Sequence, residues 1–115
     1  MPLPDFPVFY PTYIIYDIMK AVFIVFNQAN VERVEYLLDR LDVRGFTWFS
    51  NVEGRGSKTG DPHRGTHTWP EVNSAVITVV DDAKVPEILD KVHRLDQVNE
   101  EVGIRAFVWS VEQTV

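Results

Sequence analysis

Four runs of apolar or alternating residues along the chain predict β-strands. Residues 21–26 and 75–80 are continuously apolar, which is typical of strands buried on both faces. Residues 46–52 alternate between apolar and polar well enough for another strand. Residues 104–111 are expected to form the last one, and Trp48 and Trp109 are expected to pack in the core from their strands. The chain should therefore contain a four-stranded sheet.

Two segments between these strands have the spacing of amphipathic helices. Asn30 can cap the first helix, and Gly45 follows closely enough to help end it. The apolar positions of this helix are Val31, Val34, Leu37, Leu38 and Leu41. Asp81 and Asp82 can cap the second helix, in which Pro86 falls near the first turn, where proline is tolerated. Its apolar positions are Val85, Ile88, Leu89, Val92 and Leu95.

The order strand, helix, strand, strand, helix, strand predicts an α+β fold, the ferredoxin-like split βαβ sandwich (βαββαβ). Two right-handed crossovers in that order place both helices on one face of an antiparallel sheet. The continuously apolar strands then need cover on the other face as well. Either an N-terminal arm covers it, or copies of the chain pack their sheets together. We expect a symmetric oligomer.

Length and composition fit one globular domain. The chain has 115 residues, 45% hydrophobic residues, no cysteine and a formal charge of −6, which argues against a nucleic-acid partner. No apolar run reaches the roughly 20 residues needed for membrane insertion. We divide the chain into an extension at 1–18, which is either an extra strand or a tail from an upstream start, and a domain at 19–115. The absence of cysteine fits a cytoplasmic protein.

A long polar loop at 54–72 separates the second and third strands, and long loops in compact domains are usually functional or disordered. Arg55, Lys58 and Arg64 lie among glycines, so cationic side chains and free amides could meet an anion there. An ordinary solvated loop is the alternative. His63 and His67 could bind a divalent metal, although a solvated or partner-facing histidine pair is equally compatible with their spacing.

Several local motifs in 19–112 occur in a characteristic order. Met19-Lys20 precedes an apolar strand, and Arg44-Gly45-Phe46-Thr47 leads into the second strand. Val52-Glu53-Gly54-Arg55-Gly56-Ser57-Lys58-Thr59-Gly60 opens the long loop, and Val79-Val80-Asp81-Asp82 joins the third strand to the second helix. In these motifs the chain resembles the PII signal-transduction family, the trimeric nitrogen-regulatory proteins.

The resemblance implies a homotrimeric regulatory protein that is not an enzyme. It implies that a small, anionic effector binds at subunit clefts and that the T-loop, here 54–72, contacts a target enzyme or transporter of nitrogen or related metabolism. The ligand-binding residues it implies are Thr47, Gly54, Arg55, Gly56 and Lys58. The partner-binding residues are Thr59, Arg64 and Trp69, with one alternative: the indole of Trp69 could instead pack back on the domain as a hinge anchor at the base of the loop.

The chain departs from ATP-binding members of this family at several places. Glu100 and Glu101 stand where a glycine-rich B-loop with a lysine would bind phosphates, and two carboxylates would repel a polyphosphate. The sequence ends at Val115 without the basic segment of the family. Lys58 stands where a glutamine helps hold magnesium, and the loop has no tyrosine for uridylylation. The cofactor is therefore unknown, and binding of ATP and 2-oxoglutarate is doubtful.

Two other function classes remain open. One is a divalent-metal-binding trimer of the ferredoxin-like kind, which requires His63 and His67 to bind metal. The other is RNA binding through an open sheet whose aromatic side chains stack on bases. The acidic charge of the chain argues against RNA. No nucleophile, base and orienting group can be assembled from the sequence.

Overall fold

The structure is a computed structural model that describes residues 18–53, 72–98 and 103–115. The elements in this part of the chain are β1 (Met19–Asn27), α2 (Val31–Arg40), β2 (Phe46–Val52), β3 (Asn73–Asp81), α3 (Val85–Val98) and β4 (Ile104–Ser110). A short 3-10 turn precedes each helix, at Gln28–Asn30 and Asp82–Lys84. The predicted order of strands and helices is confirmed.

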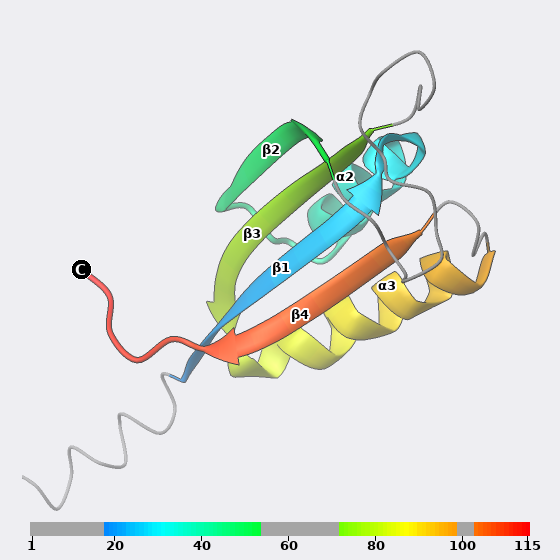
Figure 1. Cartoon of the computed structure of the whole chain (residues 1–115). Coiled ribbons are helices and arrows are strands. Elements are labelled where there is room, and N and C mark those ends of the chain that lie inside the picture. Colours follow the sequence, from blue (N-terminus) through cyan, green and yellow to red (C-terminus); the bar gives the residue numbers. More distant parts are fainter. Residues whose placement is uncertain (1–17, 54–71, 99–102) are drawn as a thin grey trace, which may run out of the picture.

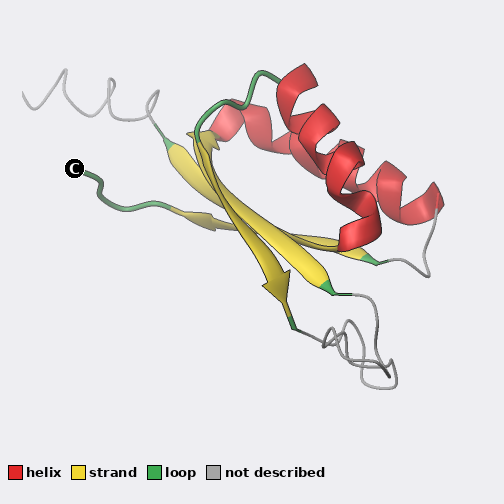
Figure 2. Ribbon diagram, turned by 90° about the horizontal axis from the view of Figure 1, so that it is seen from above, coloured by secondary structure: helices red, strands yellow, loops and turns green. Residues whose placement is uncertain are grey.

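The strands form one antiparallel sheet in the order β2-β3-β1-β4 (Figure 1). β1 pairs with β3 from Met19 opposite Asp81 to Asn27 opposite Asn73, and its other edge pairs with β4. Both helices lie on the same face of this sheet (Figure 2). The chain therefore has the predicted ferredoxin-like split βαβ sandwich, with β1 and β3 at the centre of the sheet.

The core lies between the sheet and the helices. Alternate residues of β1 face the helices, and Val22, Ile24 and Phe26 are at most 1% exposed. The other buried apolar residues of this cluster are Val34, Leu37, Leu38, Val43, Val76, Val80, Ile88, Val92 and Ile104. Trp48 of β2 closes one edge of the core, with its ring 5.4 Å from that of Phe26 in an edge-on arrangement.

Neither predicted cap of the first helix forms as expected. Asn30 occupies the N-cap position of α2, but its side chain makes no bond to the helix backbone. The Asn27 side chain instead accepts a hydrogen bond from the Ala29 backbone N–H, at 2.8 Å. At the other end Asp42, rather than Gly45, takes the left-handed backbone, with a φ of 58°. Aspartate tolerates that conformation better than most residues. The N–H groups of Asp42 and Val43 donate to the carbonyls of Asp39 and Leu38, which is the Schellman arrangement.

Three further expectations fail in the second half of the chain. Asp81 sits at the start of the turn before α3 but makes no side-chain capping bond. Leu89 is 38% exposed, so only Ile88 and Val92 of the predicted apolar stripe are fully buried. Trp109 was expected in the core, yet it is 47% exposed, because it lies on the face of β4 that is turned away from the helices.

Candidate functional site

One end of the sheet anchors both segments that interrupt the described chain. Val52 pairs with Asn73 at the point where β2 ends and β3 begins. The Gln28 N–H donates to the Val72 carbonyl at 2.9 Å, and the Asn27 N–H donates to the Gly103 carbonyl at 3.2 Å. The last residue of β1 and the residue after it therefore hold the flank of 99–102 and the flank of 54–71, which places the attachment points of both segments next to each other.

The opposite end of the sheet contains a small hollow, where α2 turns into β2. It has a volume of about 260 Å³, and Met19, Gly45, Thr78 and Lys84 are among its lining residues. The Thr78 hydroxyl donates to the Gly45 carbonyl at 2.6 Å, and the Lys84 ammonium donates to the Leu41 carbonyl at 2.6 Å. These two bonds attach the turn to β3 and to the start of α3.

The charges around this hollow balance one another. Asp42 and Asp81 oppose Arg44 and Lys84 in its lining. The Arg44 guanidinium donates to the Asp42 carboxylate at 2.8 Å, and this bond, together with the charge of Arg44, holds the pKa of Asp42 below its ordinary value. The same pairing raises the pKa of Arg44. A hollow without net charge suits the uncharged part of a ligand better than a polyphosphate.

Replacing Thr78 with valine should destabilise this corner. The side chain is 3% exposed, and valine keeps its shape but removes the donor to the Gly45 carbonyl. We expect the free energy of unfolding to fall by about 1–2 kcal/mol, measured by urea denaturation. Thr78→Ser keeps the hydroxyl and serves as the control for hydrogen bonding. A valine variant as stable as the wild type would show that this bond contributes nothing.

The face of the sheet turned away from the helices is apolar and uncovered by any described element (Figure 2). Paired residues share a face in an antiparallel sheet, so the register places Phe23 beside Ile77 and Phe107 on this side. Phe107 is 54% exposed and Val79 is 48% exposed. The remaining residues on this face are Ala21, Val25, Thr47, Phe49, Ala75, Arg105 and Trp109. We call these residues the open face.

A sequence profile, that of the nitrogen regulatory protein P-II, matches residues 19–115. The chain belongs to the P-II family. The match does not include residues 1–18, and the division of the chain predicted at that point stays a prediction. No curated protein sequence matches the chain at a significant level.

Solved structures share this P-II fold. The chain is 24% identical to CPII from Thiomonas intermedia K12, in the structure bound to ADP and bicarbonate, with a TM-score of 0.67 over 82% of this chain and 86% of that one. It is 22% identical to GlnK of B. subtilis in its ATP complex, with a TM-score of 0.63 over 86% of each chain. A PII-like signalling protein from Thermus thermophilus is 21% identical, with a TM-score of 0.58 over 82% and 87%.

Among the predicted site residues, only Thr47 lies in the described part of the P-II domain. It is exposed on the open face, opposite Ile77 and two residues from Gly45 of the hollow. The other predicted residues all lie outside the described ranges: Gly54, Arg55, Gly56, Lys58, Thr59, His63, Arg64, His67 and Trp69. Their predicted roles therefore stay predictions.

Sequence reasoning missed Asn27 and Thr78, which position the two ends of the sheet. Asn27 is a polar residue at the end of an apolar strand, and this position is a signal that could have indicated its capping role. Thr78 stands between Val76 and Val80 on the side of β3 that faces the helices, where a hydroxyl needs a partner.

Two features are absent from the described residues. No described helix is long and apolar enough to span a membrane. Within 18–53, 72–98 and 103–115, no three His, Cys, Asp or Glu side chains are grouped as a metal site would require. Since His63 and His67 lie outside these ranges, this result leaves their predicted metal role untested.

Proposed function

We propose that this P-II protein is a regulatory protein, not an enzyme, that binds a small effector between copies of the chain and regulates a target enzyme or transporter through 54–72. The observation that carries the proposal is the family match over 19–115. The target belongs to nitrogen or related metabolism, in keeping with the family description. The uncovered sheet face supports assembly, and the placement of the hollow relative to the loop flanks supports a shared effector site.

We propose a homotrimer built through the open face. Strands that are apolar on both faces normally have both faces covered, and the helices cover only one of them (Figure 2). Exposed aromatic side chains such as Phe107 and Trp109 supply apolar area that packing between copies would remove from water. The trimeric state itself comes from the resemblance to the family, since symmetry alone also permits a dimer.

The arrangement within one chain also favours a shared effector site. The hollow at Gly45 and the flanks of 54–71 lie at opposite ends of β1, which at 3.3 Å per residue are roughly 26 Å apart. The hollow, at about 260 Å³, is smaller than the roughly 300 Å³ at which ligand pockets begin. This separation favours a site that joins the hollow of one copy to the loop of another.

We propose an adenine nucleotide with few phosphates, ADP or AMP, as the effector, together with a small anion such as bicarbonate. CPII has been solved with ADP and bicarbonate and with ADP, AMP and acetate. The hollow, whose lining has no net charge, would take the nucleoside part, and Arg55 and Lys58 would attract the phosphates. Glu100 and Glu101 favour fewer phosphates by repulsion, so binding of ATP, seen in the GlnK complex, is expected to be weak here.

A thermal-shift panel tests this proposal. ATP, ADP, AMP, cyclic nucleotides, bicarbonate and divalent metals are added separately, and ADP with bicarbonate. A ligand that binds only the folded state stabilises it by about 2.7 kcal/mol at roughly 100 times its Kd. We expect ADP or AMP to raise the melting temperature by several degrees and ATP to raise it least. A shift with divalent metal alone would instead support the metal-binding trimer, and calorimetry showing micromolar ATP binding would contradict the nucleotide preference.

The Arg55→Ala/Lys58→Ala double variant tests the loop residues directly. Removing both cations should abolish the shift produced by the anionic effector, because the phosphates lose their positive partners. The ligand-free melting temperature should hardly change, since exposed substitutions usually alter stability by less than roughly 0.5 kcal/mol. A variant that keeps the full response would remove these residues from the site, whereas an unfolded variant would assign them a structural role.

A further inference from the structure

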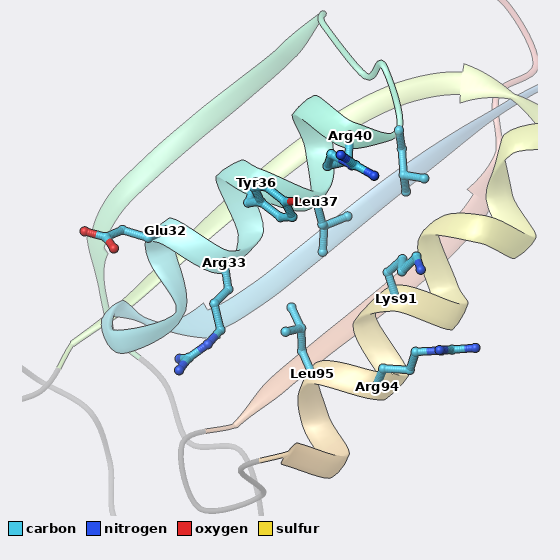
Figure 3. A pocket seen from close by; sticks show the side chains of 9 residues that line it. Glu32, Arg33, Tyr36, Leu37, Arg40, Lys91, Arg94 and Leu95 are labelled. Carbon is cyan, nitrogen blue, oxygen red and sulfur yellow. The ribbon is translucent and has the colours of Figure 1, made fainter.

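A second surface of this protein lies on the helices, on the side away from the open face. A groove of about 620 Å³ runs between α2 and α3 (Figure 3). Leu37, Leu41 and Leu95 provide its apolar floor, and Leu37 and Leu95 point toward each other across it. The Tyr36 side chain lies at the rim and is 64% exposed. The groove thus combines an apolar strip with an accessible aromatic side chain.

Positive charge is concentrated along both rims of this groove. Arg33 and Arg40 come from α2, and Lys91 and Arg94 come from α3. The chain has 17 acidic and 11 basic side chains, yet Glu32 is the one acidic residue among the described lining residues. Glu32 points away from α3, and Arg94 points away from α2, so Arg33, Arg40 and Lys91 determine the charge of the groove. The groove therefore differs in sign from the protein as a whole, and it would attract anionic partners.

The interactions of Arg33, Arg40 and Lys91 within the described residues leave these three cations available to a partner. Arg94 forms an ion pair with Asp90 at 3.0 Å, and it is the one of the four paired with a carboxylate within the described residues. The Arg33 guanidinium donates to the neutral Asn30 amide at 3.3 Å. The Arg40 guanidinium lies 5.7 Å from the ring centre of Tyr36, which fixes both side chains on the rim.

The spacing of these cations decides which kind of partner fits. Arg33 and Arg40 are seven residues apart on α2, which at 1.5 Å per residue is roughly 10 Å along the helix. A single carboxylate or phosphate is too small to span the distance between Arg33 and Arg40. A partner that uses both rims therefore carries several separated acidic groups, with apolar surface between them for the leucine floor.

We propose that this groove binds an acidic amphipathic helix of a partner protein. The helix would place an apolar stripe on Leu37, Leu41 and Leu95 and carboxylates beside the cations of both rims, which is helix-in-groove recognition with charge complementarity. The groove lies on the opposite side of the sheet from the open face, so assembly through the open face leaves it accessible (Figure 2). The inference does not depend on the nucleotide site.

Fluorescence anisotropy with a synthetic probe tests this inference on the full chain. The probe is a labelled, end-capped peptide of about 14 residues with leucines at helical i, i+3, i+4 and i+7 spacing, flanked on both sides by glutamates. A peptide of the same composition with the helical spacing scrambled is the first control, and one with lysine for glutamate is the second. We expect only the first peptide to bind, and more weakly as salt is added.

Charge reversal on both rims provides the decisive variant. Arg33→Glu/Lys91→Glu should weaken binding of the glutamate peptide by at least about tenfold, because two attractive contacts become repulsive. The charge-preserving Arg33→Lys/Lys91→Arg variant should bind within about threefold of the wild type. Neither double variant touches the hollow or the open face, so both should keep the oligomeric mass and the nucleotide response.

Three outcomes would overturn the inference. The glutamate peptide could bind no better than its scrambled control, or equally well to the charge-reversed variant. Dodecanoate could bind to the wild type but not to the charge-reversed variant while no peptide binds to either, which would assign the groove to a small anionic amphiphile. Finally, Arg33→Glu/Lys91→Glu could change the oligomeric mass in light scattering, which would make the groove an interface between copies of the chain.

Discussion

Replacing Phe107 with aspartate is expected to convert the proposed trimer into a monomer of 13.3 kDa. The ring is 54% exposed on the open face of a single chain, so the isolated fold has room for a carboxylate there. In an assembly that buries this face, each copy would carry an unpaired charge into an apolar interface, at a cost of several kcal/mol per ion. Light scattering at micromolar concentration should give three times the chain mass for the wild type and the single chain mass for the variant.

Val98→Asp is the matched control for this variant. Val98 is 76% exposed at the end of α3, away from the open face, so the same kind of change should leave the oligomer intact. Deleting residues 1–18 should likewise leave the mass and the solubility unchanged. A wild-type protein that is itself monomeric would contradict the assembly proposal, and a monomer that aggregates only after the deletion would identify the N-terminal segment as the cover of the open face.

The fold could be predicted from the sequence because each element has its own signal. The predicted strand at 46–52 coincides with β2, and the apolar runs at 21–26 and 75–80 form the centres of β1 and β3, which extend one to two residues further at each end. Continuous apolar runs predict a strand well, but they do not show which alternate residues face the helices. The tryptophans of β2 and β4 show the same limit: Trp48 packs against the core as expected, whereas Trp109 lies on the other face of the sheet.

Local chemistry was less predictable because it depends on pairs that are distant in sequence. Thr78 bonds to a carbonyl 33 residues earlier, and Lys84 bonds to one 43 residues earlier. Likewise, the sequence places Arg33 and Lys91 on the polar sides of two separate helices, and it does not show that they line the same groove. Their common groove results from how α2 and α3 lie on the sheet. The predicted effector residues from Gly54 to Lys58 lie outside the described ranges, so their predicted roles rest on the sequence alone.

The stability of the domain should depend most strongly on the helix-facing side of β1. Phe26 is 1% exposed within the core cluster, and replacing it with alanine removes most of its ring contacts and leaves a cavity. Such substitutions cost about 3–5 kcal/mol, a large share of the roughly 5–15 kcal/mol by which domains are stable. Urea denaturation of Phe26→Ala, followed by tryptophan fluorescence at a fixed protomer concentration, should show this loss as a lower midpoint.

Phe46→Ala is the matched control for Phe26→Ala, because both phenylalanine rings contact Trp48 but only Phe26 is buried. The Phe46 ring lies 6.1 Å from that of Trp48, against 5.4 Å for Phe26, but Phe46 is 43% exposed at the edge of the sheet. If burial sets the energy, Phe46→Ala should cost less than about 1.5 kcal/mol, since water already reaches much of that ring. Equal losses for the two variants would mean that the contact with Trp48, rather than burial between the sheet and the helices, determines how much each ring stabilises the fold.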